Sequence, residues 1–418
     1  MSTMNALQTS APWWKPHAGR TLLIRGGRPL VGVYPISGAK NAALPLMVSA
    51  LLTPHLVSLH NLPANLDVAV LSALLQRLGA NLSWSSGAAG LSLTVCADRV
   101  HAEKIDRELV ARMRASVLLL GAMLARCGEA SLPLPGGDAI GLRGIDFHIA
   151  GLRAMGATVE LGGGMIHARA PRGLKGAEIA LPLPSVGATE NLLLAAVLAD
   201  GRSVIRNAAR EPEVTDLATC LIAMGARIDG LDTHVLTIDG GAPLAGAVHT
   251  VMPDRIETGT LACAAAITGG ALTLANARLD LLGAAGPLLQ AAGVEMEAVG
   301  NGVIAHRAAS GTLGVDFTTQ PYPGFATDLQ APVMAMMTTA RGASAITETI
   351  FDQRFRHVDE LRRMGANIVV RGRTALVRGV PVLGAGAETV LDGLDHLDRG
   401  YDGMTAKLAA CGADIRRV

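Results

Sequence analysis

Two basic residues, Lys40 and Arg114, occupy positions where they could hold an anion. Lys40 and Asn41 follow a glycine-containing turn, SGAKN (37–41), where the chain enters an apolar stretch. Backbone N–H groups at such a helix start and a lysine ammonium can converge on one negative charge. Arg114 lies in a predicted apolar helix, RASVLLLGAMLA (114–125), where a bound phosphate or carboxylate would offset the cost of burying the charge. A solvated lysine and a structural ion pair are the alternatives.

The elements that must position these residues come from one phrase that occurs six times. In each copy a helix-like stretch ends in glycine and a strand begins, as in LLQRLGANL and LRRMGANIVV. Glycine at a helix stop favours a left-handed C-terminal cap. The six glycines are Gly79, Gly156, Gly225, Gly293, Gly365 and Gly412. The chain is therefore predicted to contain six repeated α/β units.

A second, apolar helix is predicted ahead of the strand in five of the six copies. These helices are NAALPLMVSALL, RASVLLLGAMLA, TENLLLAAVLA, ETGTLACAAAI and DLQAPVMAMMTTA, and each is apolar on nearly every side, as expected of a buried helix. The sixth copy has none. Its capping glycine follows the fifth by only 47 residues, against 68 to 77 for the other intervals. About twenty residues are missing between 379–383 and 387–391.

The missing segment has an expected energetic cost. A buried helix contributes about half a dozen large apolar side chains, at roughly 1.5–3 kcal/mol each. That sum rivals the whole stability of a typical domain. We therefore expect either that neighbouring elements shift into the space or that this part of the protein is weakened.

Composition excludes several classes of protein. The 418 residues carry a formal net charge of +1 without a long basic block, which argues against a nucleic-acid binder. The five cysteines are scattered without metal-binding spacing, which favours reduced thiols in the cytoplasm. No apolar run is long enough to span a membrane, and residues 1–19 lack the apolar core of a secretory signal. We interpret residues 1–19 as a loose tail.

Nine motifs resemble, in order, those of enolpyruvyl transferases of the UDP-N-acetylglucosamine 1-carboxyvinyltransferase family. They are PISGAKNAALP (35–45), MRAS (113–116), LPGGDAIGLR (134–143), PSVGATEN (184–191), NAAREPEVTD (207–216), PDRIETGT (253–260), FATDLQA (325–331), TETIFDQRF (347–355) and HLDRGY (396–401). The match covers nearly all of residues 20–418. It implies a two-lobed, inside-out α/β barrel of six repeats, here with the sixth repeat truncated.

The resemblance also implies a domain division and a reaction. Residues 20–39 with 253–418 would form one lobe and residues 40–252 the other. The enolpyruvyl group of phosphoenolpyruvate would move to the 3-hydroxyl of UDP-N-acetylglucosamine, releasing phosphate through a tetrahedral intermediate. This reaction is the first committed step of peptidoglycan synthesis, and it requires no metal or organic cofactor. The oligomeric state is not implied.

Four residues are assigned to phosphoenolpyruvate by their motif positions. Lys40 and Asn41 in SGAKN, Arg114 in MRAS and Arg399 in HLDRGY match residues that contact this substrate or close on it. The alternative for Arg399 is an ion pair with Asp398 or Asp402 on a helix surface. Arg255 and Glu257 fall at the returning hinge strand, where either a functional or a structural role fits.

Asp138 stands where many members of the family carry a cysteine that acts as general acid toward the methylene carbon of phosphoenolpyruvate. An aspartic acid can donate that proton, but its ordinary pKa is about 3.9, against about 8.5 for cysteine. Burial or a nearby anion must raise the pKa before the acid is protonated at neutral pH. A surface-loop aspartate is the alternative. Because a carboxylate is a weaker nucleophile than a thiolate, epoxide antibiotics of the fosfomycin type should fail here.

The remaining assignments concern the UDP-sugar. Asp328 resembles the residue that contacts the sugar 3-hydroxyl and acts as its base, although an acidic residue at a helix start also fits simple capping. Contacts to the nucleotide and diphosphate are expected from Arg143, Gly144, Ile145, Asp146, Phe147, Ser185, Val186, Gly187 and Ile350. Many relatives carry Pro-Val where this chain has Gly144 and Ile145. A turn and a core aliphatic are the respective alternatives for 185–187 and Ile350.

The shortened sixth copy keeps a second reading open. The family carries a D-L-R-A-S type phrase in the missing block, with an arginine that faces phosphoenolpyruvate. Losing one preorganised cationic donor costs a factor of roughly a hundred in turnover at comparable sites. The alternative to an active transferase is therefore a noncatalytic paralogue that binds UDP-sugar. A third reading, the sister enzyme acting on shikimate phosphate, shares the architecture but not the SGAKN and LPGGDAIGLR phrases.

Overall fold

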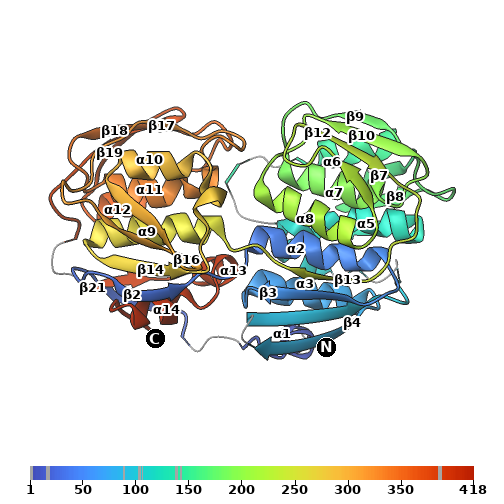
Figure 1. Cartoon of the computed structure of the whole chain (residues 1–418), viewed down its shortest axis with the longest axis horizontal. Coiled ribbons are helices and arrows are strands. Elements are labelled where there is room, and N and C mark those ends of the chain that lie inside the picture. Colours follow the sequence, from blue (N-terminus) through green and yellow to red (C-terminus); the bar gives the residue numbers. More distant parts are fainter. Residues whose placement is uncertain are drawn as a thin grey trace. The chain divides into compact units, whose positions relative to one another are not determined.

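The computed structural model describes residues 3–15, 19–87, 90–101, 105, 107–136, 140–141, 144–384 and 388–418, with side chains from Leu7 onward. The chain divides into two compact units (Figure 1). Unit 1 comprises the described parts of residues 1–15, 38–138 and 143–252, and unit 2 those of residues 16–37, 139–142 and 253–418. The chain thus passes from unit 2 to unit 1 after Ser37 and returns after Met252.

The described part of unit 1 contains three sheets. Their strand orders are β13-β3-β5-β4, β6-β8-β7 and β11-β12-β10-β9. The strands are β3 (Val57–Leu62), β4 (Asn81–Gly87), β5 (Gly90–Cys96), β6 (Glu129–Pro133), β7 (Thr158–Gly162), β8 (Met165–Arg169), β9 (Glu178–Ala180), β10 (Arg202–Arg206), β11 (Arg227–Asp229), β12 (Val235–Asp239) and β13 (Ala247–Thr250). In the two four-stranded sheets, one edge strand pairs parallel with its neighbour and the other pairs are antiparallel.

The described part of unit 2 also contains three sheets, ordered β15-β16-β14-β2, β17-β18-β20-β19 and β21-β1-β22. The strands are β1 (Leu22–Arg25), β2 (Val31–Pro35), β14 (Ala271–Ala275), β15 (Val294–Val299), β16 (Gly302–Arg307), β17 (Phe317–Thr318), β18 (Ala343–Thr347), β19 (Asn367–Arg371), β20 (Thr374–Arg378), β21 (Glu388–Leu391) and β22 (Asp414–Arg417). In each unit the sheets lie on the outside and cover helices (Figure 1).

All five predicted apolar helices are present and form the cores of their units. They are α2 (Lys40–Ser49) with the 3₁₀ turn η1 (Ala50–Leu52), η2 (Arg114–Val117) with α5 (Leu118–Cys127), α7 (Val186–Ala196), α9 (Arg255–Thr268), and η4 (Thr327–Leu329) with α11 (Gln330–Met337). Close packing between α5 and α7 depends on Gly121, because a Cβ there would lie 2.3 Å from the Asn191 carbonyl oxygen. The Gly121 amide donates to Asn191 Oδ1 at 2.8 Å.

The six predicted glycine stops are confirmed. The helices that they end are α3 (Leu66–Arg77), α6 (Asp146–Ala154), α8 (Pro212–Ala223), α10 (Ala285–Ala291), α12 (His357–Arg363) and α14 (Met404–Ala410). Each capping glycine has a φ between +85° and +103°, a conformation that disfavours any side chain. After five of them the next amide donates back to the helix, as Ala80 N does to Leu75 O at 3.0 Å.

The sixth repeat is shortened as the spacing predicts, and its strands belong to a three-stranded sheet in the described part of the chain. Among the described residues no helix lies between β20 and β21. The central strands β14 and β18 each pair with a parallel edge strand, whereas β21 pairs only with β1 in the described structure. Val390 on β21 is 60% exposed.

The N-terminal segment differs from the loose tail that the sequence suggests. It forms α1 (Thr3–Ser10), which packs on α3 and buries Leu7 and Ala11. Trp84 Nε1 donates to the Ser10 carbonyl at 2.8 Å, and the Trp84 ring meets the Trp13 ring edge-on. Leu7 within the helix and Ala11 just after it are buried although the segment has no continuous apolar run.

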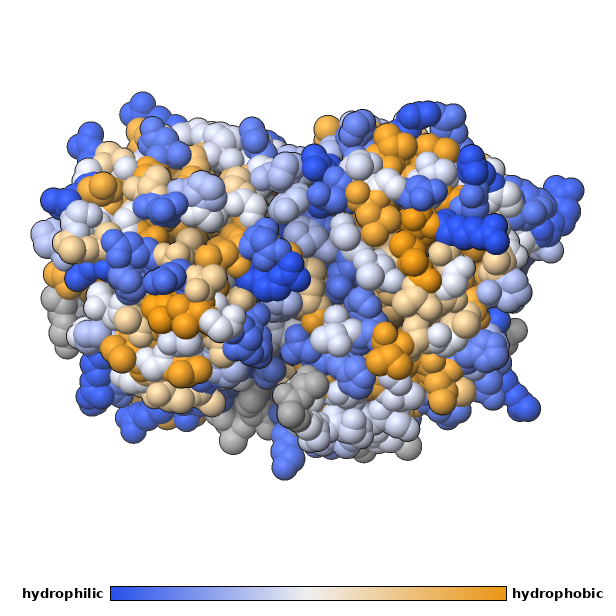
Figure 2. Space-filling view, viewed as in Figure 1, coloured by the Kyte–Doolittle hydropathy of each residue, from blue (hydrophilic) through white to orange (hydrophobic). Residues whose placement is uncertain are grey.

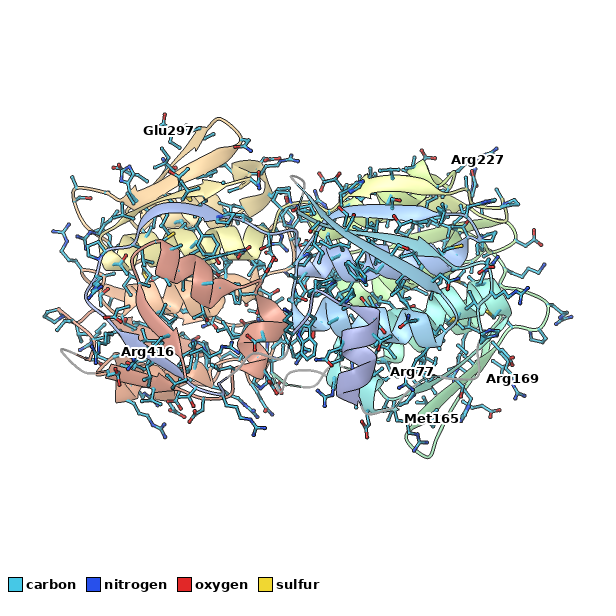
Figure 3. All side chains as sticks on the ribbon, turned by 90° about the horizontal axis from the view of Figure 1, so that it is seen from below. Arg77, Met165, Arg169, Arg227, Glu297 and Arg416 are labelled. Atoms are coloured by element: carbon cyan, nitrogen blue, oxygen red, sulfur yellow. The ribbon has the colours of Figure 1, made fainter. Side chains whose placement is uncertain are left out.

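The remaining helical segments are short. They are α4 (Arg107–Arg112), η3 (Leu279–Leu282) and α13 (Asp395–Gly400). None of the helices in the described residues has the length and apolar character needed to cross a bilayer. Apolar residues on the face shown form strips separated by hydrophilic side chains (Figure 2). The labelled charges of both signs, such as Arg227 and Glu297, lie at the periphery of their units (Figure 3).

Candidate active-site residues in each unit

Lys40 is the first residue of α2, and a buried carboxylate from α3 lies beside it. Its Nζ is 3.7 Å from Oδ2 of Asp67, whose side chain is 5% exposed against 25% for Lys40. The turn before the helix needs glycine at position 38, because a Cβ there would lie 1.7 Å from the Asn61 carbonyl oxygen. Asn41 is exposed at the same helix start. The ammonium is thus held at the N-terminus of α2 together with backbone N–H groups.

Arg114 is not inside a helix, as the sequence analysis assumes, but at the first position of the 3₁₀ turn η2. It is half-buried there, because the regular helix α5 begins only at Leu118. Its Nη2 donates to the Gly144 carbonyl at 2.6 Å. A bound anion is therefore not required to offset the cost of burying the Arg114 charge. The guanidinium instead holds the turn that leads into α6.

The two segments assigned to the nucleotide meet around His148 in unit 1. The His148 ring is buried on α6, and Asn191 of α7 lies 3.0 Å from its Nδ1. A Cβ at Gly187 would be 3.5 Å from the ring. Ser185 caps α7 by accepting from the Ala188 amide at 3.4 Å. Residues 144–147 and 185–187 are therefore neighbours, although about forty residues separate them in the sequence.

Burial, and secondarily the charge of Arg114, lowers the pKa of His148 to about 4. Burial, and secondarily Arg354, lowers the pKa of His357 to about 4 as well. Both rings are therefore neutral at physiological pH. His148 can orient neighbouring groups by hydrogen bonding, but it adds no positive charge for a phosphate.

These two histidines predict an acid-labile fold. Above about pH 6.5 both rings are neutral in the folded and unfolded chain, whereas below it the unfolded chain takes up protons that the folded chain resists. The free energy of unfolding should fall by about 2 kcal/mol per ring between about pH 7.5 and pH 5. Urea unfolding at the two pH values measures this loss. His357→Gln should remove about half of it; an equal loss in this variant and in the unsubstituted protein would contradict the assignment.

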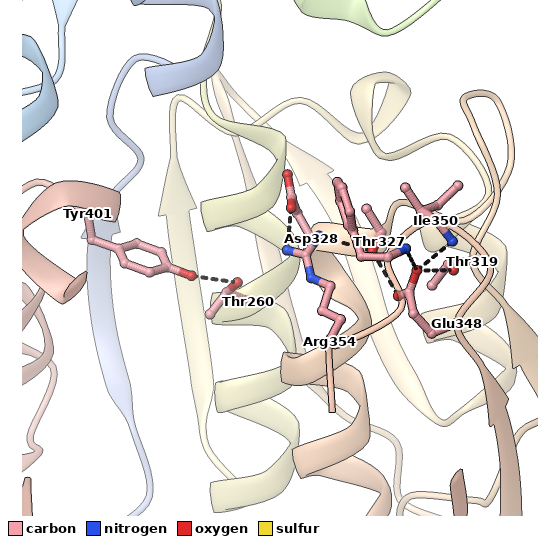
Figure 4. A network of polar contacts seen from close by, with 9 residues as sticks. Thr260, Thr319, Thr327, Asp328, Glu348, Ile350, Arg354 and Tyr401 are labelled. Atoms are coloured by element: carbon pink, nitrogen blue, oxygen red, sulfur yellow. Dashed lines mark hydrogen bonds and ion pairs between the residues drawn. The ribbon is translucent and has the colours of Figure 1, made fainter. Parts of the chain in front are cut away.

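Asp328 in unit 2 is paired with an arginine that the sequence analysis does not single out. Arg354 donates to Asp328 Oδ1 at 2.5 Å and to Thr327 Oγ1 at 3.0 Å (Figure 4). The Asp328 side chain is 38% exposed and that of Arg354 is 18% exposed. The residues at the cap positions of η4 and α11, Ala326 and Leu329, contribute no side-chain cap. The carboxylate is thus partly accessible and held in a defined orientation.

A buried glutamate organises the loop next to Asp328. Glu348 is 1% exposed and accepts hydrogen bonds from the hydroxyls of Thr319 and Thr327 (Figure 4). It also accepts from the backbone N–H groups of Ile350, at 2.8 Å, and Phe351, at 3.0 Å. The Ile350 amide is therefore already engaged. Both Glu348 and Arg354 lie in the TETIFDQRF motif, and this motif is the sequence feature from which they could have been predicted as site residues.

Arg399 lies in the last turn of α13, next to a residue anchored on α9. The Tyr401 hydroxyl is 3.3 Å from Thr260 Oγ1, and burial raises the pKa of Tyr401 to about 12 (Figure 4). Of the two carboxylates considered as partners for Arg399, Asp398 receives two hydrogen bonds from Arg417, at 3.0 Å and 2.5 Å. Arg255 and Glu257 are buried at the start of α9.

Two predicted site residues, Asp138 and Arg143, lie outside the described residues. Their neighbours in the chain, Gly136 and Gly144, are described in unit 1. In the described part of the chain, no three His, Cys, Asp or Glu side chains are grouped so that they could hold a metal ion. The described groups are cations at a helix start and turn in unit 1, and an oriented carboxylate in unit 2.

Repeated α/β units with outer sheets thus carry a lysine at a helix start in unit 1 and an oriented aspartate in unit 2. Residues 24–408 match the family model described as EPSP synthase (3-phosphoshikimate 1-carboxyvinyltransferase). The chain belongs to this enolpyruvyl transferase family.

Relatives and solved structures agree with this assignment. The chain is 51% identical to the UDP-N-acetylglucosamine 1-carboxyvinyltransferase of Rhodospirillum centenum, over 95% of this chain and 98% of the relative. It is 51% identical to the enzyme of the same name from Granulibacter bethesdensis, over 94% and 98%. The enolpyruvyl transferase NikO from Streptomyces tendae superimposes with a TM-score of 0.86 at 25% identity, covering 96% of this chain and 99% of that one. The predicted inside-out α/β fold and the transferase class are confirmed.

Proposed function

We propose that this enzyme transfers the enolpyruvyl group of phosphoenolpyruvate to the 3-hydroxyl of UDP-N-acetylglucosamine and releases phosphate. The observation that carries the proposal is the 51% identity over 95% of this chain and 98% of a relative named for that transfer. The described residues of both units contribute suitable groups. In unit 1, Lys40 stands at a helix start, and in unit 2, Arg354 holds Asp328.

The phosphoenolpyruvate anions are assigned to cations. Lys40 and Asn41 at the N-terminus of α2 bind the phosphate, where the helix dipole favours negative charge. Arg114, which also donates to the Gly144 carbonyl, is assigned to a carboxylate or phosphate by its position in the MRAS motif. Arg399 supplies a further cation from unit 2.

The UDP-sugar is assigned to the segments that meet around His148 and to the Glu348 loop. Arg143, Gly144, Ile145, Asp146 and Phe147 face the nucleotide, and Ser185, Val186 and Gly187 face the diphosphate. Ile350 contacts the uracil or sugar through its carbonyl oxygen, since its amide donates to Glu348. Asp328, oriented by Arg354, accepts the proton of the 3-hydroxyl.

The reaction then balances in two steps. Asp138 donates a proton to the methylene carbon of phosphoenolpyruvate while the deprotonated sugar oxygen attacks C2, which gives a tetrahedral phospholactyl ether. The Asp138 carboxylate takes a proton back from the new methyl group as phosphate departs, which restores the double bond. The cations hold the phosphate throughout, and no cofactor takes part. The proposed domain division places residues 20–39 with 253–418 in one lobe and residues 40–252 in the other.

The proposed place of the reaction is the bacterial cytoplasm, as the first committed step of peptidoglycan synthesis. All five cysteines are free, and burial raises the pKa of the Cys220 and Cys263 thiols to about 12, which suits inert buried thiols. A direct test of substrate class is mass analysis of the product formed from phosphoenolpyruvate with either UDP-N-acetylglucosamine or 3-phosphoshikimate. Product from the shikimate phosphate alone would overturn the proposed acceptor.

Insensitivity to fosfomycin is a further expected result. Because Asp138 replaces the thiol with a carboxylate, incubation with the epoxide should cause no time-dependent loss of activity. The matched variant Asp138→Cys restores a thiolate nucleophile and should be inactivated progressively. Residual activity against time, with mass analysis of the protein, measures both. An adduct on Asp138 in the unsubstituted enzyme would contradict the prediction.

A further inference from the structure

We propose that Lys407, acting through the buried carboxylate of Glu257, is a positioning residue for the segment that carries Arg399. The proposal rests on the proposed function, because it assumes that Arg399 contacts phosphoenolpyruvate. The residues concerned are Tyr34, Ser37, Glu257 and Lys407, hereafter the Glu257 cluster. All four belong to unit 2 and are described.

Glu257 is the centre of the cluster. It lies in the first turn of α9 and is 2% exposed. Its Oε1 accepts from the Tyr34 hydroxyl at 2.9 Å, and its Oε2 accepts from the Ser37 amide at 2.8 Å. Tyr34 is fully buried on β2. Glu257 therefore fixes the end of β2 just before the chain leaves unit 2, and its charge is largely removed from water.

Lys407 supplies the cation that this charge requires. It reaches the cluster from α14, with Nζ 2.5 Å from Ser37 Oγ and 3.4 Å from Glu257 Oε1. The same ammonium lies 5.2 Å from the centre of the Tyr34 ring. Its side chain is only 17% exposed. A charge pair this deeply buried is costly to break from one side, because the remaining charge stays buried without compensation.

Tyr401 provides a second attachment to the same helix. Its hydroxyl is 3.3 Å from Oγ1 of Thr260, which lies three positions after Glu257 and so on the same face of α9 (Figure 4). The stretch from Tyr401 to Lys407 is thus tied to α9 at both ends. Arg399 lies two residues before the first tie. Its position relative to α9 depends on these polar contacts.

The shortened sixth repeat explains why polar contacts matter here. Neither α13 nor α14 contains a fully buried residue. Beyond α14, Cys411 joins the apolar core of unit 2, and Met404, Leu408 and Ala413 pack partly against it. These contacts hold the segment down but are not directional. The hydrogen bonds of Lys407 and Tyr401 have fixed geometry, so they set the orientation that apolar packing leaves loose.

The test compares Lys407→Met with Arg416→Met, which removes an exposed cation from β22 of the same repeat. Lys407→Met should raise the KM for phosphoenolpyruvate and lower kcat, roughly ten- to hundredfold together, since small misplacements of a substrate-positioning group cost this much. The KM for UDP-N-acetylglucosamine should stay within a few-fold. Arg416→Met should resemble the unsubstituted enzyme. Equal kinetics for the two variants, or an equal rise in both KM values, would overturn the proposal.

Two further measurements keep the proposal testable. Tyr401→Phe removes only the bond to Thr260. It should raise the KM for phosphoenolpyruvate, by less than Lys407→Met does, and leave the KM for UDP-N-acetylglucosamine nearly unchanged. This variant tests the proposal even if Lys407→Met fails to fold. Amide hydrogen exchange in residues 395–410 should increase in Lys407→Met and not in Arg416→Met, whether or not turnover occurs. Absence of turnover in the unsubstituted enzyme would count against the proposed function, whereas unchanged exchange would count against the positioning role.

Discussion

Asp328→Asn should lower kcat by a factor of roughly 10² to 10⁴, the usual contribution of a general base. Asparagine keeps the size of the side chain but cannot accept the proton of the sugar hydroxyl. Arg354 holds the carboxylate by one hydrogen bond at 2.5 Å, and the side chain is 38% exposed, so the substitution should leave the fold intact. Steady-state kinetics and calorimetric binding of UDP-N-acetylglucosamine measure the two effects separately.

The matched control for this variant is Asp359→Asn, an exposed carboxylate paired with Arg362 on α12. This substitution removes one negative charge from the same unit and leaves the Asp328–Arg354 pair intact, so the kinetics of the variant should match those of the unsubstituted enzyme. UDP-sugar binding should be retained in both variants. If Asp328→Asn turns over within several-fold of the unsubstituted enzyme, Asp328 is not the base.

The second large effect is expected for Lys40→Met. The ammonium at the N-terminus of α2 would bind the phosphate that develops charge as it leaves, and loss of one such donor costs about 10² to 10³ in turnover. The KM for phosphoenolpyruvate should rise, because the same contact is made in the bound substrate. Initial rates at varied phosphoenolpyruvate with saturating UDP-sugar provide both numbers.

Lys175→Met is the comparison for Lys40→Met. Lys175 is paired with Asp200 at 2.6 Å on the surface of unit 1, and its side chain is 58% exposed. The same change of residue type there should leave kcat and KM unaltered. Thermal unfolding of both variants separates loss of a ligand contact from loss of the Lys40–Asp67 pair. Normal kinetics in Lys40→Met would refute its role.

The repeated architecture could be predicted from local signals in the sequence. The positive φ at Gly79 and Gly365 favours glycine, so the ends of these helices can be predicted from the residue type alone. Helices such as α7 are apolar on every side, which indicates burial without knowledge of the neighbours. The missing block followed from the spacing of the glycines. The shortest strand, β17, could not be predicted, because two residues carry no periodicity of their own.

The candidate site was predictable only where a motif includes the residue itself. Lys40 and Asp328 stand out by their positions at helix starts, but their partners do not. Arg354 lies 26 residues from Asp328, and Lys407 lies 370 residues from Ser37. Such pairs arise when segments distant in the sequence fold against one another, and no local pattern specifies them. Arg114 shows the opposite error, because an apolar sequence suggested a helix interior where the structure has a 3₁₀ turn.

The most direct measurement is phosphate release by the purified protein given phosphoenolpyruvate and UDP-N-acetylglucosamine, with Asp138→Ala as the control. We expect release that requires both substrates and is abolished in Asp138→Ala, which would establish a transferase that tolerates its shortened sixth repeat. Absence of release despite measurable UDP-sugar binding would contradict it and identify a noncatalytic UDP-sugar-binding protein.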